Sequence, residues 1–145
     1  MNARCAALIL DAHVWANAAC GPSDAPHYFV DLMDRVPGAT VTRGMPYAEK
    51  CRRLGECWMQ QSSWCATHGG FCRCEPVDVD FSGLPCVDFS PAGERRGLDG
   101  DTIELFIVWA RLHCAQQTPL VILENVPDQR GRETANCVCA LALRL

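Results

Sequence analysis

The chain of 145 residues lacks any apolar run near the roughly 18 residues that a membrane-spanning helix needs. It is also poor in positive charge, because Lys50 is the single lysine, the net charge is −4, and no basic tract occurs. These absences exclude a transmembrane protein and argue against a protein that holds nucleic acid by bulk charge alone. With 49% hydrophobic and 21% charged residues, the composition is that of one globular domain.

Cysteine is abundant instead, at 11 of the 145 residues. This approaches the roughly 8–10% that marks a secreted disulfide scaffold. However, Asp11 and His13 interrupt the apolar stretch of residues 1–20, so it is a poor secretory leader. The odd count would also leave one thiol unpaired. We therefore expect mostly reduced cysteines in an intracellular protein, which is not secreted and would be nuclear in a eukaryote.

Five of the cysteines lie close together in the sequence, with His68 among them: Cys51, Cys57, Cys65, Cys72 and Cys74. Their spacing contains no paired CxxC, which is the usual signature of a zinc site. We therefore predict no metal ligands. A zinc-stabilised interaction module with ligands between Cys51 and Cys74 remains an alternative, beside the use of cysteine as a small buried hydrophobe.

Residues 1–75 form a cysteine-rich segment that is hard to assign. Gly21–Pro26 has the composition of a linker, and a short helix is expected between Tyr28 and Val36. A second helix is predicted from Pro46 onward, since Cys51, Leu54 and other apolar residues through Trp58 recur at helical spacing. These elements carry no clear functional signal.

Residues 76–128 are more informative. Apolar and acidic residues alternate over 77–81 and predict a strand, which a loop rich in glycine and proline follows at 82–100. Asp101 and Glu104 open an apolar helix to about residue 116, and the run 120–123 predicts a parallel strand covered on both faces. The order strand, helix, strand predicts a right-handed βαβ unit, and thus an α/β fold with a parallel sheet.

Reactive side chains follow both predicted strands. Cys86 lies in the loop after the first strand, and Glu124 ends the second. Ligands of open α/β sheets bind at the carboxyl ends of the strands. Because the two strands are expected to be neighbours, a nucleophilic thiol and an acid should face one crevice.

The same residues resemble a known family. Pro85-Cys86, followed by Phe89-Ser90 and then by alanine, glycine and arginine residues up to Asp99, is similar to the catalytic loop of the DNA (cytosine-5)-methyltransferases. The segment Leu123–Val126 is similar to that family's Glu-Asn-Val motif. The resemblance implies a partial Rossmann-like fold of the S-adenosylmethionine-dependent methyltransferases, with residues 76–128 as its catalytic core.

The resemblance also implies a mechanism. Cys86 would attack carbon 6 of a flipped cytosine, and Glu124 would hold and protonate the ring at nitrogen 3. Carbon 5 would then take the methyl group of S-adenosylmethionine. The apolar neighbours of Glu124, Leu123 and Val126, are expected to desolvate its carboxyl and favour the protonated form. The substrate would be DNA, with tRNA open as an alternative.

Further roles follow by position in the motifs. The resemblance assigns the substrate to Ser90, Arg95 and Asn125, and the cofactor to Pro85 and Leu105. Arg95 and Arg96 are candidates to favour the thiolate form of the nucleophile. The segment Gly93–Gly100 is expected to be a mobile loop that suits base flipping.

Some family features have no counterpart in the sequence. Leu84 stands where the family has a second proline, and Val87 where it has glutamine. No cofactor-binding glycine loop precedes residue 77, and residues 129–145 are expected to be a truncated C-terminal segment. The first hypothesis is therefore a cytosine-5 methyltransferase-like protein that carries part of the machinery. The alternative is a non-catalytic fragment, or a nucleic-acid-binding or regulatory module that retains the motif.

Overall fold

A computed structural model describes residues 3–21, 24–90 and 92–124. The chain divides into two compact units, one made of Met1–Asp31 and Gln61–Cys74, the other of Leu32–Gln60 and Glu75–Leu145. Within the described ranges, no helix combines the length and the apolar character needed to cross a membrane. Seven cysteines whose side chains the structure describes carry free thiols: Cys51, Cys57, Cys65, Cys72, Cys74, Cys86 and Cys114.

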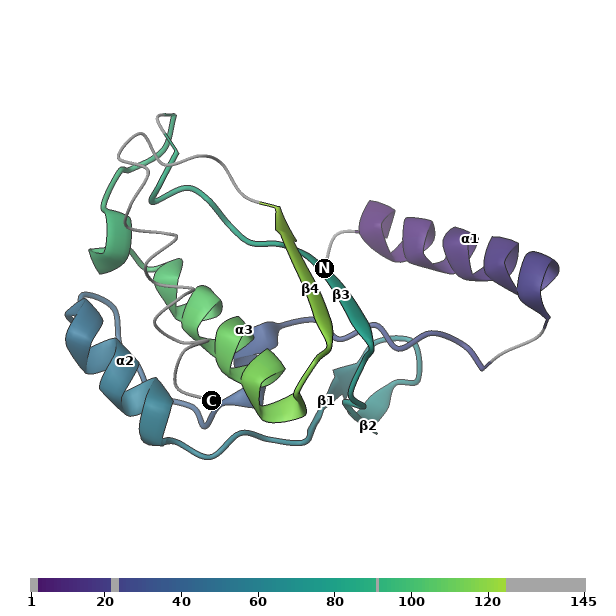
Figure 1. The fold of residues 1–145 in the computed structure, drawn as a ribbon, viewed down its shortest axis with the longest axis horizontal. Helices are drawn as coiled ribbons and strands as arrows, with labels where there is room; N and C mark the ends of the chain where they lie inside the picture. Colours follow the sequence, from purple (N-terminus) through teal and green to yellow (C-terminus); the bar gives the residue numbers. More distant parts are fainter. Residues whose placement is uncertain (1–2, 22–23, 91, 125–145) are drawn as a thin grey trace. The chain divides into compact units, whose positions relative to one another are not determined.

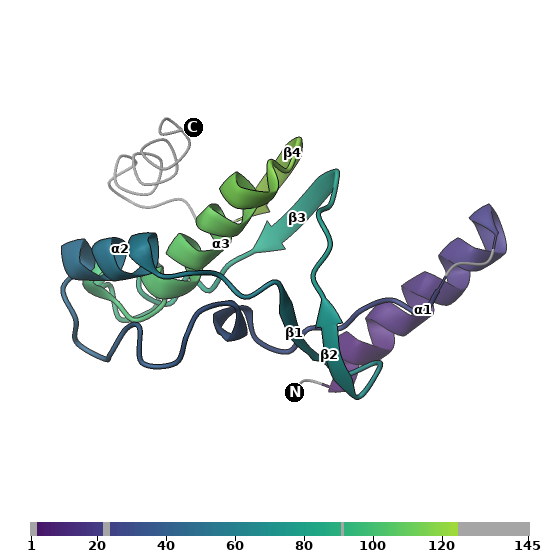
Figure 2. The same cartoon turned by 90° about the horizontal axis from the view of Figure 1, so that it is seen from below.

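The first unit contains a helix and a hairpin. Helix α1 spans Ala3–Cys20, and strands β1 (Ser62–Cys65) and β2 (Gly70–Arg73) pair antiparallel (Figure 2). Cys65 pairs with Gly70 at the closed end of the hairpin, and Phe29 forms an isolated bridge with Cys65. The segment before residue 32 is therefore extended at this point. The short helix expected from Tyr28 to Val36 is reduced to the 3₁₀ turn η1 (Leu32–Arg35) of the second unit.

The second unit contains the predicted βαβ order. Strand β3 spans Val79–Gly83, helix α3 spans Ile103–Gln116, and strand β4 spans Leu120–Glu124 (Figure 1). The short 3₁₀ turn η2 (Gly97–Asp99) precedes α3. Strands β3 and β4 are parallel neighbours in register. The prediction of an α/β fold with a parallel sheet is confirmed, with the first strand shifted by two residues.

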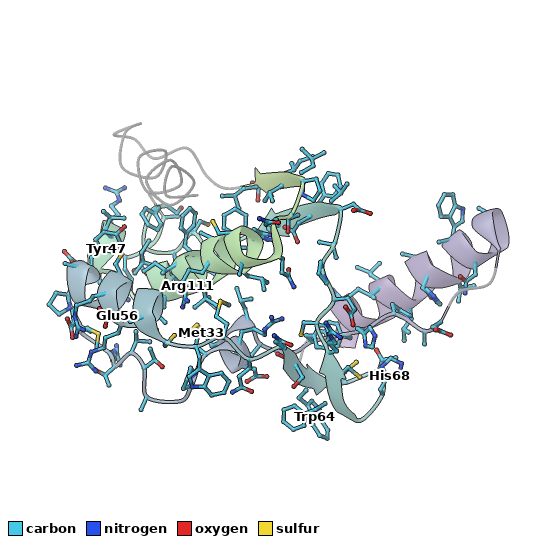
Figure 3. All side chains as sticks on the ribbon, turned by 60° about the horizontal axis from the view of Figure 1, so that its bottom comes forward. Met33, Tyr47, Glu56, Trp64, His68 and Arg111 are labelled. Atoms are coloured by element: carbon cyan, nitrogen blue, oxygen red, sulfur yellow. The ribbon has the colours of Figure 1, made fainter. Side chains whose placement is uncertain are left out.

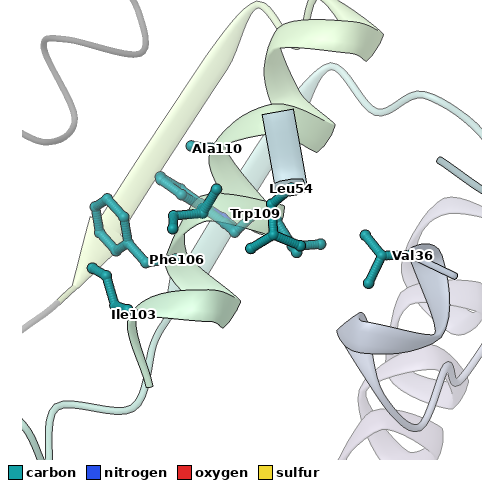
Figure 4. Close-up of a cluster of buried hydrophobic side chains, with 8 residues drawn as sticks. Val36, Leu54, Ile103, Phe106, Trp109 and Ala110 are labelled. Carbon is teal, nitrogen blue, oxygen red and sulfur yellow. The ribbon is translucent and has the colours of Figure 1, made fainter. Parts of the chain in front are cut away.

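The apolar helix α3 is the centre of the second unit's core. Its buried residues Ile103 and Phe106–Ala110 pack with Val36, which follows η1, and with Leu54 of helix α2 (Tyr47–Glu56) (Figure 4). Helix α2 spans Tyr47–Glu56, so the helix predicted from Pro46 is confirmed and ends before the exposed Trp58. The burial of α3 on nearly all sides explains its nearly continuous apolar sequence.

Only one face of the two-stranded sheet is covered within the described residues, so the expectation that β4 is covered on both faces is wrong here. Side chains alternate along a strand, and α3 packs on the face of Val121 and Leu123. The opposite face is exposed and carries the large apolar side chains Val79, Phe81, Leu120 and Ile122. The apolar run of β4 therefore has one set of side chains against α3 and the other set on the exposed face of the sheet.

Strand β3 presents polar side chains to α3. Trp109 Nε1 donates a hydrogen bond of 2.7 Å to Ser82 Oγ, and the Ser82 hydroxyl in turn donates to Asp80. His113 Nε2 lies 3.4 Å from the Asp80 carboxylate. Burial lowers the pKa of His113, although the charge of Asp80 acts in the opposite direction. These contacts fix the orientation of β3 on the helix.

Helix α2 is joined to α3 by a buried charge. The Lys50 side chain is fully buried, and its Nζ donates to the Gly100 carbonyl at 2.8 Å and lies 3.1 Å from Glu104 Oε1. On the other side, Arg111 of α3 donates to the carbonyls of Leu54 and Cys57, where α2 ends; Figure 3 labels this arginine beside the helix. Lys50 thereby holds the N-terminal end of α3 against α2, and Arg111 holds a later turn of α3 against the end of α2.

Replacing Lys50 with methionine is expected to lower the free energy of unfolding by about 2 kcal/mol, because the carbonyl and the carboxylate lose a buried partner. Urea denaturation followed by the helical circular dichroism signal measures this change. Arg52→Met on the exposed side of the same helix is the control, and its exposed ion pairs should cost about 0.5 kcal/mol or less. Equal losses in the two variants would contradict the role given to Lys50.

Candidate active site

The parallel register places the ends of β3 and β4 side by side. Gly83, the last residue of β3, pairs with Glu124, the last residue of β4. A methyl group built on Gly83 would lie 3.7 Å from Oε2 of Glu124, so the carboxylate stands directly over the strand end. Cys86 follows three residues later in the chain. The thiol-bearing loop and the carboxylate therefore leave the same edge of the sheet.

Cys86 lies in a tight turn. Its carbonyl accepts hydrogen bonds from the N–H groups of Phe89 at 2.9 Å and Ser90 at 2.7 Å. The Cys86 side chain is half-buried, and Pro85 before it is exposed. The Ser90 hydroxyl accepts the N–H of Ala92 at 3.2 Å. The turn thus fixes the backbone on the C-terminal side of the thiol.

A buried carboxylate anchors this turn to helix α3. Asp88 is completely buried and accepts bonds from the Thr102 N–H at 2.9 Å and the Thr102 hydroxyl at 2.6 Å. Arg96 Nε donates to its other oxygen at 3.0 Å. Burial alone would raise the pKa of Asp88, but the bonds from Thr102 and the charge of Arg96 together bring this pKa below its ordinary value. Asp88 is therefore held as a carboxylate at the start of α3.

Two glycines of the loop are required by close packing. A methyl group on Gly93 would lie 1.8 Å from the Val87 carbonyl oxygen, and one on Gly100 would lie 2.0 Å from Cγ of Asp88. Neither position can hold a side chain without moving the backbone or the buried carboxylate. The segment expected to be mobile is therefore fixed at both ends by contacts with the turn that follows Cys86.

The two arginines of the motif differ in their surroundings. Arg96 lies between three carboxylates, 3.0 Å from Asp88, 2.8 Å from Glu94 and 3.1 Å from Asp101. Because its charge is compensated there, its role in this structure is to hold the loop. Arg95 is exposed and has a left-handed backbone, with φ of +55°. The proposed contact of Arg95 with substrate stays a prediction.

Glu124 is exposed, so the expectation that Leu123 and Val126 desolvate its carboxyl is not met by the described residues. The reason is the alternation along β4, which turns Leu123 toward α3 and Glu124 to the open face of the sheet. Val126 and the predicted substrate residue Asn125 lie outside the described residues. Leu105, predicted to contact the cofactor, is half-buried on α3. The roles of these residues stay predictions.

A second group of reactive side chains lies in the first unit. We call it the Cys2His2 cluster, and it consists of His27, Cys65, His68 and Cys72. One potential metal-binding atom from each residue lies within 4.8 Å of those from the other three. The sequence pattern predicts no metal ligands, and its zinc alternative is limited to residues 51–74, which leaves out His27. The chain gives no local signal for it, because His27 is 38 residues from Cys65 in the sequence.

The comparison with known proteins addresses the second unit. The family model for C-5 cytosine-specific DNA methylases matches residues 72–142, which include β3, the Cys86 loop, α3 and β4. These residues belong to that family. The resemblance given by the two motifs is thereby confirmed at the level of the family.

The chain is also similar to a curated protein, which is a methyltransferase. The chain is 38% identical over 60 residues to the Type II methyltransferase M.Bsp6I of Bacillus sp. (strain RFL6). The match covers 41% of this chain and 19% of the relative, so the chain spans about a fifth of that methylase. No solved structure matches the chain. The C-5 cytosine methylase segment begins at Cys72, so most of the Cys2His2 cluster precedes it.

Proposed function

We propose that the chain carries the nucleophile and the acid of a cytosine-5 methyltransferase, with residues 76–128 as the catalytic core of a partial Rossmann-like fold. The observation that carries the proposal is the register of β3 and β4, which brings Glu124 to the edge from which the Cys86 loop leaves. The membership of residues 72–142 in the C-5 cytosine methylase family supports the same chemistry. The proposed substrate is cytosine in DNA, with tRNA as the alternative.

The proposed first step belongs to Cys86. Its thiolate adds to carbon 6 of cytosine, which forms a sulfur–carbon bond and moves the electron pair of the carbon 5–carbon 6 double bond toward carbon 5. Carbon 5 becomes nucleophilic only through this addition. The fixed turn after Cys86 supports the role because it limits the positions that the half-buried thiol can take.

Glu124 is proposed as the acid. In its protonated form it would donate a proton to nitrogen 3 of the ring and so stabilise the electron-rich intermediate. Its place over Gly83, on the open face of the sheet, leaves room for a base that has been flipped out of the duplex. Burial of the carboxyl would then come from the bound base. Ser90, Arg95 and Asn125 are the proposed contacts to the rest of the nucleotide.

In this family S-adenosylmethionine supplies the methyl group. Two positions on this chain are proposed to contact it, the exposed Pro85 at the strand end and the half-buried Leu105 on α3. The described residues contain no Gly-x-Gly turn between a strand and a helix that would bind the nucleotide half of such a cofactor. They do not build a complete cofactor site, so we derive no step through it.

A non-catalytic role is the second candidate, and it is favoured because the described residues build only part of a cofactor site. The segment with the Cys86 loop would then serve as a nucleic-acid-binding or regulatory module. In both cases we propose an intracellular protein, which suits the free thiols of the described cysteines.

DNA that contains 5-fluorocytosine distinguishes the two candidates. With S-adenosylmethionine present, a catalytic chain should form a covalent complex whose mass equals protein, DNA and one methyl group, since fluorine cannot leave carbon 5 as a proton does. Mass spectrometry of the denatured complex measures this. If S-adenosylmethionine binds in calorimetry and no covalent complex appears, the enzymatic function is wrong and the binding module is favoured.

A further inference from the structure

The Cys2His2 cluster has the dimensions of a metal site. His68 Nδ1 lies 3.3 Å from Cys65 Sγ and 3.5 Å from Cys72 Sγ, while the rings of His27 and His68 are 4.7 Å apart at their centroids. In a tetrahedral site with zinc–sulfur bonds of about 2.3 Å and zinc–nitrogen bonds of about 2.1 Å, neighbouring ligands are about 3.6 Å apart. The two measured contacts are close to this edge length.

The hairpin explains how a sequence without CxxC makes this arrangement. Cys72 of β2 pairs with Ser63, which is two residues before Cys65 in β1. Residues paired across strands, and residues two apart on one strand, share a face of the sheet, so both thiols project on one side. His68 lies in the turn that joins the strands, where Figure 3 labels it. The pattern Cys-x2-His-x3-Cys is therefore the closed end of a hairpin.

The fourth side chain comes from another segment. His27 lies two residues before Phe29, which bridges to Cys65, and the N–H of Tyr28 donates to Cys65 Sγ at 3.4 Å. Backbone N–H groups directed at sulfur are typical neighbours of metal-bound thiolates. The segment that holds His27 is thus fastened to the hairpin at the cluster itself.

Apolar packing contributes little within the described residues of the first unit. Among its described residues Cys65 is the single buried apolar side chain, and the exposed aromatic pair Trp64 and Phe71 projects from the hairpin. A two-stranded hairpin is marginally stable in water, and domains this small usually need disulfides or a metal. The buried apolar side chain in the described part of this unit, Cys65, is therefore a potential metal ligand and not part of a hydrophobic core.

We propose that the Cys2His2 cluster binds one Zn²⁺ ion, which joins the segment of His27 to the hairpin. Two thiolates and two imidazoles in a tetrahedral arrangement are a set that selects zinc over the oxygen-preferring Mg²⁺ and Ca²⁺. With four protein ligands the site has no open position, so its role is structural. The cluster belongs to the first unit and the Cys86 loop to the second, and the proposed zinc site does not depend on whether the chain methylates DNA.

Metal analysis of the full chain tests the proposal. Protein expressed with zinc and purified under reducing conditions should contain one zinc per chain by mass spectrometry of the metal. After removal of zinc, titration with Co²⁺ alone should give sulfur-to-cobalt charge-transfer absorption that saturates at one equivalent, together with the strong visible bands of tetrahedral cobalt. This spectrum reports the thiolates directly and does not depend on a variant that folds.

Variants assign the ligands. Cys72→Ser and His27→Gln should each weaken Co²⁺ binding by about 100-fold or more, since loss of a ligand exceeds the 10–100-fold cost of losing an outer partner. Cys51→Ser, at a half-buried cysteine of α2 outside the cluster, should bind as the unchanged chain does. The proposal is overturned by a chain with well under one zinc and no charge-transfer band, by unchanged binding in Cys72→Ser, or by a disulfide between Cys65 and Cys72 in its place.

Discussion

Replacing Asp88 with alanine is expected to lower the free energy of unfolding by about 3 kcal/mol, because a buried, fully partnered carboxylate is removed. The substitution leaves the N–H and hydroxyl of Thr102 without their acceptor and takes a carboxylate from Arg96. The start of α3 and the turn after Cys86 should loosen together. Urea denaturation gives the free energy, and amide hydrogen exchange at Thr102 gives the local opening.

The chain offers a matched control in Glu94. Its carboxylate lies 2.8 Å from the same guanidinium of Arg96, but its side chain is 61% exposed. An exposed ion pair contributes about 1 kcal/mol or less, so Glu94→Ala should have a small effect. If Asp88→Ala and Glu94→Ala cost the same, or if Thr102 keeps its protection in Asp88→Ala, the anchoring role of Asp88 is contradicted.

The same contact predicts a dependence on pH. The folded state lowers the pKa of Asp88 below its unfolded value, so the carboxylate stabilises the fold above the unfolded pKa. That contribution is lost as the pH falls from about 4 through the folded pKa. Acid unfolding of the unchanged chain should therefore be steeper in this range than that of Asp88→Asn, which cannot ionise. Curves of the same slope would contradict the prediction.

The sequence predicts the order β3, α3, β4 because each element has a distinct local pattern. It does not predict which face of β3 meets the helix. Apolar and acidic residues alternate along the strand, and in the structure the polar side chains of Asp80 and Ser82 face α3. Their partners on α3 are about 30 residues away, and a local pattern does not contain them.

The candidate site shows the same limit. Cys86 and Glu124 are recognisable from their motifs, and the pairing of their strands is a general property of βαβ units. The sequence does not predict that Asp88 anchors the turn to α3, because an acidic residue in a loop is usually solvated. Its burial depends on Thr102 and on the space left by Gly100, which lie 12 or more residues away in the sequence. Gly100 is the one signal in the sequence for this buried carboxylate, since a glycine often marks a place where other atoms approach the backbone closely.

The proposed function depends on the addition of Cys86 to carbon 6 of cytosine, with Glu124 as the acid. This addition has a consequence that needs no methyl donor. Once the thiolate has added, carbon 5 takes a proton from water; loss of the original carbon 5 hydrogen and departure of the thiolate then restore cytosine. Cytosine labelled with tritium at carbon 5 should therefore release tritium into water.

We expect Cys86→Ser to abolish tritium release and Glu124→Gln to slow it by about 100-fold or more, the range for loss of a positioned acid. Cys114→Ser, at a half-buried cysteine of α3, is the control and should keep the full rate. The most direct measurement is thus the rate of tritium release from DNA labelled at carbon 5 of cytosine, compared between the unchanged chain and Cys86→Ser. We expect release that depends on Cys86; equal rates in the two proteins, or no release from DNA that the unchanged chain binds, would contradict the proposed role of Cys86.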